Sequence, residues 1–227
     1  MRKENGFTLI ELMVTIALMA LFAAFAIPAM NGFLERQRVN STLNNYTNAL
    51  TFARNEAIRQ NLPVVVCGAN ISSAGQLTAS GCGTDWSEGV FVFGEANKTL
   101  GYQATGSSTD INIRVVQSPN KSDGPKKVTI ISSARDSMGA GIDTNPTNPT
   151  NPMFQFLPNG QVARLSSGNL VVADMYLRLE IVSESDNQKK AVALMDPTGQ
   201  IIRCTKKTIE SNSSNGTSNN IAKFCLS

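Results

Sequence analysis

Residues 6–30, GFTLIELMVTIALMALFAAFAIPAM, decide the architecture, and their only ionisable side chain is Glu11. At about 1.5 Å per residue, a helix over residues 7–30 reaches about 36 Å, whereas the hydrocarbon core of a bilayer is roughly 30 Å thick. Length and composition therefore predict that residues 7–30 form a transmembrane helix. We expect this helix to be the lower half of a longer stem.

Three interpretations of this stretch compete. A secretory signal peptide would use Arg2 and Lys3 as its positively charged region. The apolar segment of such a peptide usually has about 7–15 residues, which is shorter than the apolar run at 7–30. A simple membrane anchor explains the length but not Glu11, because an acidic group inside the hydrocarbon costs about 2.5–3.5 kcal/mol. The third interpretation uses every residue as it stands: a short charged leader, MRKEN, is followed by Gly6, Phe7 and then Glu11.

That third pattern resembles the class III signal of type IV prepilins and pseudopilins. The resemblance implies that residues 1–6 are a leader, that a prepilin peptidase cuts between Gly6 and Phe7, and that Phe7 is N-methylated. It also implies that Glu11 pairs with the terminal amine of a neighbouring subunit during assembly. Pro28 matches the proline of many pilin stems, and a proline inside a helix removes one backbone hydrogen bond and kinks or loosens the helix.

The composition excludes several classes of protein. The net charge of the 227-residue chain is +3, which is too small to indicate a nucleic-acid-binding protein by charge alone. The chain has no histidine, so it cannot build a Ser-His-Asp or Cys-His catalytic arrangement. We therefore expect no enzyme activity and no cofactor. We also expect no metal site, because the chain has no C-x-x-C pair and no Asp-rich loop of recognisable ligand spacing.

The chain has four cysteines, Cys67, Cys82, Cys204 and Cys225, and no C-x-x-C pair. An even number behind an export signal indicates two disulfides, which can be paired in three ways. The sequence-local pairing, Cys67 with Cys82 and Cys204 with Cys225, is favoured. Four buried free thiols are the alternative interpretation.

Residues 31–61 are predicted to continue the stem as an amphipathic helix that ends at Asn61-Leu62-Pro63. Its apolar residues fall within an arc of about 80° at 100° per residue, so they form a narrow stripe that should lie on a globular domain. The stripe comprises Val39, Leu43, Tyr46, Leu50, Ala53 and Ala57. The opposite side should face away with Arg36, Arg38, Asn40, Asn44, Asn48 and Asn55.

Residues 62–227 change to short apolar runs separated by Gly, Pro, Asn and Ser, which predicts a β-rich head. The expected strands are 64–67, 89–93, 111–117, 128–132, 154–157, 162–165, 175–182, 191–195 and 200–205. Apolar and polar residues alternate in 111–117 and 175–182, as in half-buried antiparallel strands. Pro158-Asn159-Gly160 predicts a hairpin turn, and residues 143–152 and 210–220 predict surface loops.

Three motifs in this half resemble the GspH/FimT family of minor pilins and pseudopilins. They are ALTFARNEAIRQNLPVVVCG at 49–68, WSEGVFVF at 86–93 and FLPNG at 156–160. The resemblance implies an α+β fold in which a long N-terminal helix, half membrane segment and half amphipathic, packs on an antiparallel β-sandwich-like head. A bridge from Cys204 to Cys225 would then occupy the position of the C-terminal disulfide loop of many pilins.

A DNA-uptake branch of this family carries a Gly-Arg-x-Arg motif near its C terminus. The matching stretch here is Gly199-Gln200-Ile201-Ile202-Arg203, in which Gln200 replaces the first arginine. Arg203, Lys206 and Lys207 are therefore only weak candidates for DNA contact, and we interpret them as a solvated face.

The resemblance implies a minor type IV pilin, a structural subunit that primes or caps pilus assembly for twitching motility, adhesion or DNA uptake. The alternatives are a minor pseudopilin of a type II secretion system and a DNA-binding pilin for natural transformation. The implied partners are other minor and major pilins through the stem, the prepilin peptidase, the inner-membrane assembly platform and the lipid bilayer. The implied location is the inner membrane, single-pass with the head in the periplasm, and then the pilus or pseudopilus at the cell surface.

Overall fold

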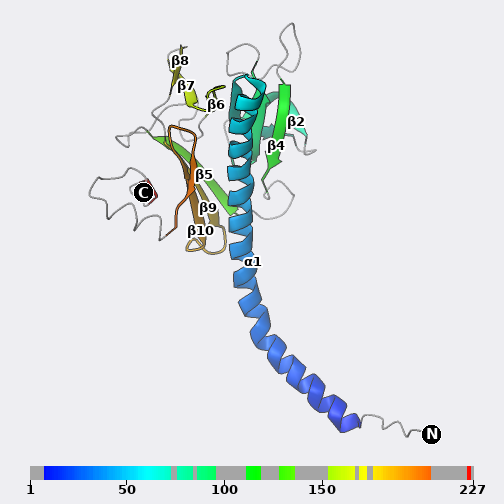
Figure 1. Ribbon diagram of the computed structural model, residues 1–227. Helices are drawn as coiled ribbons and strands as arrows, with labels where there is room; N and C mark the ends of the chain where they lie inside the picture. The colour runs from blue at the N-terminus through cyan, green and yellow to red at the C-terminus, as the bar shows by residue number, and fades with distance from the viewer. Residues whose placement is uncertain are drawn as a thin grey trace, which may run out of the picture. The chain divides into compact units, whose positions relative to one another are not determined.

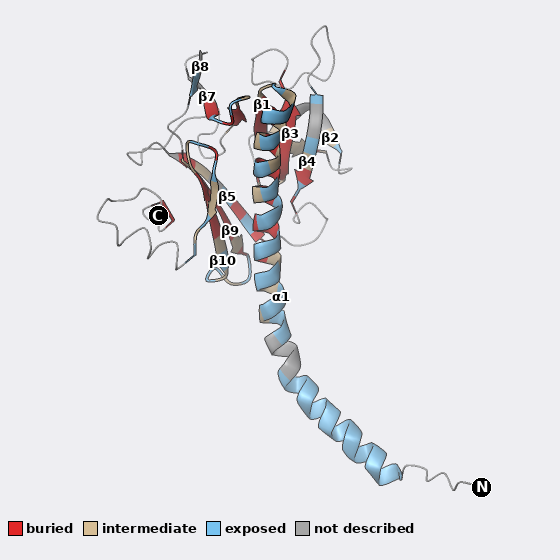
Figure 2. Ribbon diagram, viewed as in Figure 1, coloured by how far each residue is buried: buried red, intermediate tan, exposed pale blue. Residues whose placement is uncertain are grey.

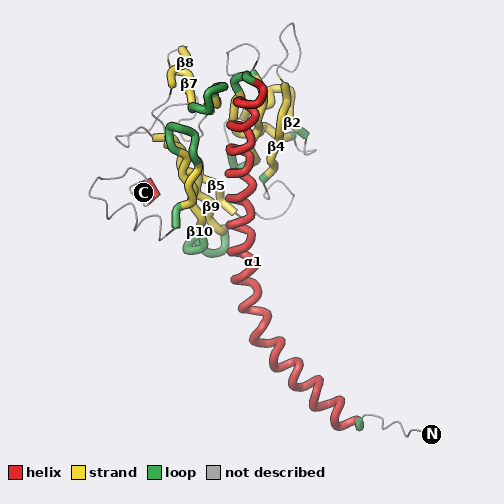
Figure 3. Tube along the Cα trace, viewed as in Figure 1, coloured by secondary structure: helices red, strands yellow, loops and turns green. Residues whose placement is uncertain are grey.

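The computed structural model describes residues 8–72, 76–83, 86–95, 111–118, 128–135, 153–166, 169–172, 176–205 and 224–225. The described residues form one long helix, α1 (Leu9–Gln60), followed by strands in two antiparallel sheets (Figures 1 and 3). The chain divides into two compact units, Met1–Arg38 and Val39–Ser227, and α1 runs through both. The predicted α+β class is confirmed.

Helix α1 ends where the sequence predicted. Its last residue is Gln60, and Asn61 follows with a φ of 51°. Asparagine tolerates this left-handed conformation better than most residues, and it commonly terminates helices there. Pro63 also prevents the helix from continuing, because a proline pushes the residue before it, here Leu62, toward extended backbone.

The first sheet, sheet A, has seven strands in the order β4-β3-β1-β6-β7-β8, and β2 also pairs with β1. Its strands are β1 (Val64–Ile71), β2 (Leu77–Gly83), β3 (Gly89–Gly94), β4 (Ile111–Gln117), β6 (Phe154–Phe156), β7 (Val162–Ser166) and β8 (Asn169–Val172). The second sheet, sheet B, has four strands in the order β11-β10-β9-β5. These are β5 (Val128–Arg135), β9 (Tyr176–Ser183), β10 (Lys190–Met195) and β11 (Ile201–Arg203).

The main core lies between the second half of α1 and both sheets. All six residues of the predicted stripe are at most 2% exposed, and they pack with apolar residues of β1, β3, β5, β6 and β9. Figure 2 colours the ribbons of β1 and β3 largely as buried. The hydroxyl of Tyr46 also donates a hydrogen bond of 2.7 Å to the backbone oxygen of Trp86. On the opposite side, Arg36 and the four predicted asparagines are exposed, and Arg38 is half-buried. The stripe is thus confirmed as the surface that holds the head on the stem.

Sheet A is also buried on the face that does not contact α1. Residues Val65, Cys67, Ala69, Ile71, Phe91 and Phe93 form a second apolar cluster there. This second cluster explains why VVVC and VFVF are continuous apolar runs, because a strand buried on both faces does not alternate.

The turn at Pro158-Asn159-Gly160 is confirmed. The N–H of Leu157 donates to the oxygen of Gln161 at 2.8 Å, and Gly160 has a φ of 82°. Gly199, in the turn between β10 and β11, has a φ of 79°. A Cβ atom at Gly199 would lie 3.0 Å from the Gly160 oxygen and 3.1 Å from Nε of Arg54. The turns of the two sheets therefore meet over α1, and glycine is what permits this approach.

Three details differ from the predictions. Strands β2 and β8 were not predicted, since β2 is rich in Gly, Ser and Ala and β8 is short. In β4, Ile111 is 51% exposed rather than inward-facing, while Val116 is 9% exposed. The reason is an irregularity in the pairing, in which Val92 faces Arg114 but Phe93 faces Asn112. The expected loops at 143–152 and 210–220 lie outside the described residues.

Candidate assembly and stabilisation sites

The first turn of α1 places Glu11 close to the start of the helix. Thr8 caps the helix, because its hydroxyl oxygen accepts the N–H of Glu11 at 3.3 Å and its backbone oxygen accepts the N–H of Leu12 at 3.2 Å. A carboxylate in this turn gains about 0.3–1 kcal/mol from the helix dipole. That gain is smaller than the cost of about 2.5–3.5 kcal/mol for a charge in hydrocarbon. The position of Glu11 in the first turn therefore does not offset the cost of its charge in the hydrocarbon. A positively charged partner would offset that cost.

The predicted sites near the start of the chain also include Gly6, Phe7 and Pro28. Gly6 and Phe7 lie outside the described residues, so the predicted cleavage site stays a prediction. Pro28 lies within α1, as expected for a pilin-like stem.

The lower part of α1 exposes large apolar side chains, and at 100° per residue their positions surround the helix. Figure 2 colours this part of the ribbon as exposed, apart from a grey segment. Fourteen of them, between Leu9 and Leu34, are 50–76% exposed. They are Leu9, Ile10, Leu12, Met13, Val14, Ile16, Leu18, Met19, Leu21, Phe22, Phe25, Met30, Phe33 and Leu34. A helix that is apolar all round requires lipid or other protein around it, so this surface is a contact surface.

Among the described residues, no single helix is by itself long and apolar enough to cross a membrane. Two parts of α1, Leu9–Phe25 and Met30–Gln60, meet the length and composition requirement only when they are taken together.

Two disulfides close loops in the head. Cys67 bonds to Cys82 across strands β1 and β2, with the Cα atoms 5.6 Å apart. Cys204 bonds to Cys225 with the Cα atoms 5.5 Å apart. These are the sequence-local pairs. In the chain-entropy estimate, each closure stabilises the fold by roughly 3 kcal/mol.

The stretch that matches the Gly-Arg-x-Arg motif is residues 199–203. It begins in the turn between β10 and β11 and continues through the edge strand β11. Asp196 holds this turn, because its Oδ1 accepts the N–H groups of Thr198 and Gln200, each at 2.9 Å. An Nη2–H of Arg203 donates to Oδ1 of Asn40 on α1 at 2.9 Å. Arg203 thus ties β11 to the stem, and Lys206 and Lys207 lie outside the described residues.

A buried ionic network on strand β9 was missed by the sequence analysis. Arg178 and Glu180 are only 9% and 8% exposed, and they form an ion pair through Nη1 and Oε2. Lys190 adds a second contact, with its Nζ 3.2 Å from Oε1 of Glu180. Burial by itself raises the pKa of Glu180, but the hydrogen bonds and charges of Arg178 and Lys190 together outweigh it and hold the pKa below its usual value.

Arg54 is another residue that the sequence analysis missed. Its Nε–H donates to the Gly160 oxygen at 3.1 Å, so it links α1 to the turn between β6 and β7. The sequence signal that could have found it is a charged residue adjoining the apolar stripe, since Ala53 is fully buried.

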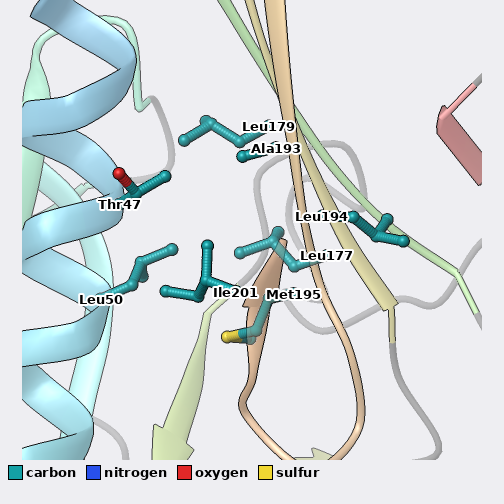
Figure 4. Close-up of a pocket in the computed structure, with 8 residues that line it drawn as sticks. All are labelled: Thr47, Leu50, Leu177, Leu179, Ala193, Leu194, Met195 and Ile201. Atoms are coloured by element: carbon teal, nitrogen blue, oxygen red, sulfur yellow. The ribbon is translucent and has the colours of Figure 1, made fainter. Parts of the chain in front are cut away.

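Among the described residues, no group of three His, Cys, Asp or Glu side chains could hold a metal ion. Residues of α1 and sheet B line a crevice that is apolar apart from Thr47 (Figure 4). The hydroxyl of Thr47 donates to the Leu43 oxygen of its own helix at 3.0 Å. Leu50, Leu177 and Leu179 of this lining belong to the buried core, so the crevice is part of the core packing.

Two family models match the chain. Residues 1–27 match the prokaryotic N-terminal methylation motif, and residues 42–194 match the family described as type II transport protein GspH. Together these matches cover the first and last parts of the stem and most of the head, and residues 28–41 of the stem lie between them.

Curated relatives match over a short stretch. The type IV major fimbrial protein FimA of Dichelobacter nodosus is 51% identical over 37 residues, which are 16% of this chain and 23% of that protein. A fimbrial protein of the same organism is 51% identical over 35 residues, or 15% and 22% of the two chains. The match thus spans about a quarter of the length of these relatives.

Solved structures with a similar arrangement include two proteins. One is the type IV minor pilin FimU of Pseudomonas aeruginosa (strain PAO1), at 16% identity and a TM-score of 0.44 over 77% of this chain and 94% of that chain. The other is the minor pseudopilin EpsH of the type 2 secretion system of Vibrio cholerae, at 10% identity and a TM-score of 0.38 over 74% and 96%.

Proposed function

From the premise that this chain belongs to the GspH family and begins with a prokaryotic N-terminal methylation motif, we propose that it is a minor type IV pilin. In this role it is a structural subunit that primes or caps pilus assembly. Family membership places it among pilins and pseudopilins, and the choice of the pilus is our proposal.

The observation that carries the proposal is the exposed apolar surface of residues 9–34 with Glu11 near its start. Such a surface is unstable in water, so it must pass from lipid to a packed protein environment without facing solvent. A filament built from stem helices provides that second environment. Glu11 then meets the terminal amine of a neighbouring subunit, and both charges are compensated.

We propose the following route for the chain. The prepilin peptidase cleaves between Gly6 and Phe7 and methylates Phe7, while residues 7–30 hold the protein in the inner membrane. The head lies in the periplasm, where an oxidising environment suits its two disulfides. The assembly platform then adds the stem to other minor and major pilins in the filament.

A second candidate is a minor pseudopilin of a type II secretion system. The description of the matched family, a type II transport protein, favours this role. The third sequence-based alternative, a DNA-binding pilin, gains no support from Arg203, because its guanidinium is engaged with Asn40 of the stem.

Deletion of the gene in its native host separates the two leading roles. Loss of surface pili and twitching with normal protein secretion would support the pilin. Loss of secretion with normal piliation would instead assign the chain to the secretion system. Complementation with the intact gene should restore the affected process, and it controls for effects on neighbouring genes.

A further inference from the structure

Phe224 and Cys225, near the C terminus, lie on the face of sheet B that points away from α1. The Phe224 ring lies 4.9 Å from the ring of Tyr176 between centroids. Its backbone oxygen accepts a hydrogen bond of 3.1 Å from Nε–H of Arg178. Cys225 bonds to Cys204 just beyond the end of β11. Phe224 is 2% exposed and Cys225 is 7% exposed, so both are buried.

The strand register shows what lies on this face of sheet B. Arg178 is opposite Leu194, Glu180 is opposite Val192, and the N–H of Cys204 donates to the Val192 oxygen at 2.9 Å. Because alternate residues of a strand share a face, these side chains belong to the same side as Tyr176. Figure 4 shows Leu194 pointing to the opposite side of the sheet from Leu179 and Ala193.

This outer face is buried although it lies away from the main core. Leu194 is fully buried and Val192 is 8% exposed, yet neither belongs to the cluster that α1 covers. Phe224 supplies an apolar ring and a carbonyl oxygen, which match the ring of Tyr176 and the donor of Arg178. Glu180 holds the other side of the Arg178 guanidinium, so Nε–H is oriented toward Phe224.

We propose that Tyr176 and Arg178 form a binding site for Phe224, and that occupation of this site directs Cys225 to pair with Cys204. The ring contact and the hydrogen bond involve no sulfur atom, so they can form while the thiols are still reduced. Docking of Phe224 raises the effective concentration of the Cys225 thiol at Cys204. Tyr176 and Arg178 are therefore positioning residues for oxidative folding.

The covalent step is an ordinary thiol–disulfide exchange. The thiolate of one cysteine attacks a small disulfide such as oxidised glutathione and releases one reduced glutathione. The second thiolate attacks the resulting mixed disulfide and releases another. The two protein thiols together lose two electrons and two protons, and the oxidant gains them as two thiols.

The test is a redox titration of the full chain, purified in detergent, in glutathione buffers of graded ratio. Each disulfide is quantified by alkylation and peptide mapping. The Cys67–Cys82 pair is an internal control, because it lies on sheet A in a different cluster. The variants are Phe224→Ala, Arg178→Ala and Arg178→Lys. Lys189→Ala serves as a charge control, since Lys189 pairs with Asp186 in the turn before β10.

We expect Phe224→Ala and Arg178→Ala to lower the effective concentration of the Cys204–Cys225 pair about tenfold or more and to leave the Cys67–Cys82 pair unchanged. Arg178→Lys should fall in between, because it keeps the charge beside Glu180 but lacks the Nε–H donor. Lys189→Ala should match the unmodified chain. An unchanged Cys204–Cys225 pair in Phe224→Ala, or an equal loss at both pairs, would overturn the proposal.

A second measurement does not depend on the stability of the Arg178 variants. In the Cys204→Ser/Cys225→Ser chain, Phe224 should still occupy its site. Nuclear Overhauser contacts between the rings of Tyr176 and Phe224 would support independent docking. Their absence in a chain whose Cys67–Cys82 disulfide still forms would show that the bond holds the segment, rather than the segment directing the bond.

Discussion

The two halves of α1 use apolar residues in opposite ways. Between Leu9 and Leu34, large apolar side chains surround the helix and are 50–76% exposed. Between Val39 and Ala57, apolar residues form one stripe that is at most 2% exposed, and the other side carries asparagines. The distribution of apolar side chains around the helix, rather than their number, thus distinguishes a surface that contacts other molecules from a surface that contacts the chain's own head.

Blocking the removal of residues 1–6 tests the lower half most severely. Gly6→Val should abolish cleavage, because the resemblance places the peptidase cut immediately after this glycine. No mature protein beginning with N-methylated Phe7 should then form, and the chain should be absent from filaments. Mass spectrometry of the N terminus and immunoblots of sheared pili provide the measurement. A mature start beyond residue 24 in the unmodified chain would indicate a conventional signal peptide instead.

Glu11→Ala should leave cleavage and membrane insertion intact, because removing a charge makes the segment more apolar. We expect incorporation into filaments to fall about tenfold or more, since a neighbouring amine then lacks its counter-charge. Glu35→Ala is the matched control, because it removes a carboxylate outside the first turn of the same helix. Normal piliation with co-purification of the Glu11→Ala chain would contradict charge pairing.

The same substitution, leucine to alanine, should have different effects in the two halves. Leu43 is fully buried, so Leu43→Ala should lower the free energy of unfolding of the head by about 2–5 kcal/mol. Leu21 is 58% exposed, so Leu21→Ala should change head stability by less than about 0.5 kcal/mol. Urea unfolding of the full chain in detergent, followed by Trp86 fluorescence, measures both. Equal effects would mean that the stripe does not hold the head.

Tyr46→Phe should have a smaller effect than Leu43→Ala. It removes the donor of the buried hydrogen bond to the Trp86 oxygen, while the ring still fills the core. We expect a loss of about 0.5–1.5 kcal/mol in the free energy of unfolding, because the Trp86 oxygen then keeps only the N–H of Gly89, at 3.2 Å, as a donor. The same urea titration applies, and stability at or above that of the unmodified chain would indicate that the hydrogen bond contributes nothing.

The smallest expected effect is that of Glu56→Gln, near the end of α1. Hydrogen bonds from Arg59 and Gln60 lower the pKa of Glu56 from 4.5 to about 2, so its ionised form stabilises the folded state above pH 4.5. That contribution should disappear as the pH falls from 4.5 to about 2. Because the Arg59 side chain of this ion pair is 69% exposed to solvent, we expect less than about 0.5 kcal/mol. Stability curves of the two chains should therefore converge in acid, and a constant difference would contradict this origin.

The sequence was most informative where one physical requirement dominates. The stripe of α1 and the Pro158-Asn159-Gly160 turn were predicted because helical period and turn chemistry act locally. Ile111 was misplaced because the pairing of β3 with β4 skips one residue of β4, which changes which residues of β4 face inward. The sequence analysis assigned Arg178 and Glu180 to the polar face of a half-buried strand. Both are buried, and Arg178 contacts Phe224, which lies about 45 positions away in the sequence. Interactions between distant segments are what a local pattern does not encode.

The Cys204–Cys225 bond also changes what a protease can do to this chain. A single cut between these two residues would leave a nicked, two-chain molecule in which the C-terminal piece stays attached through sulfur and Phe224 keeps its contact with Tyr176. The loop that the Cys204–Cys225 bond closes also tolerates changes in length, because each doubling of the length of a flexible loop costs only about 0.6 kcal/mol in closure entropy. Insertions between Cys204 and Cys225 are thus a route by which the surface could diversify during evolution while the fold is kept.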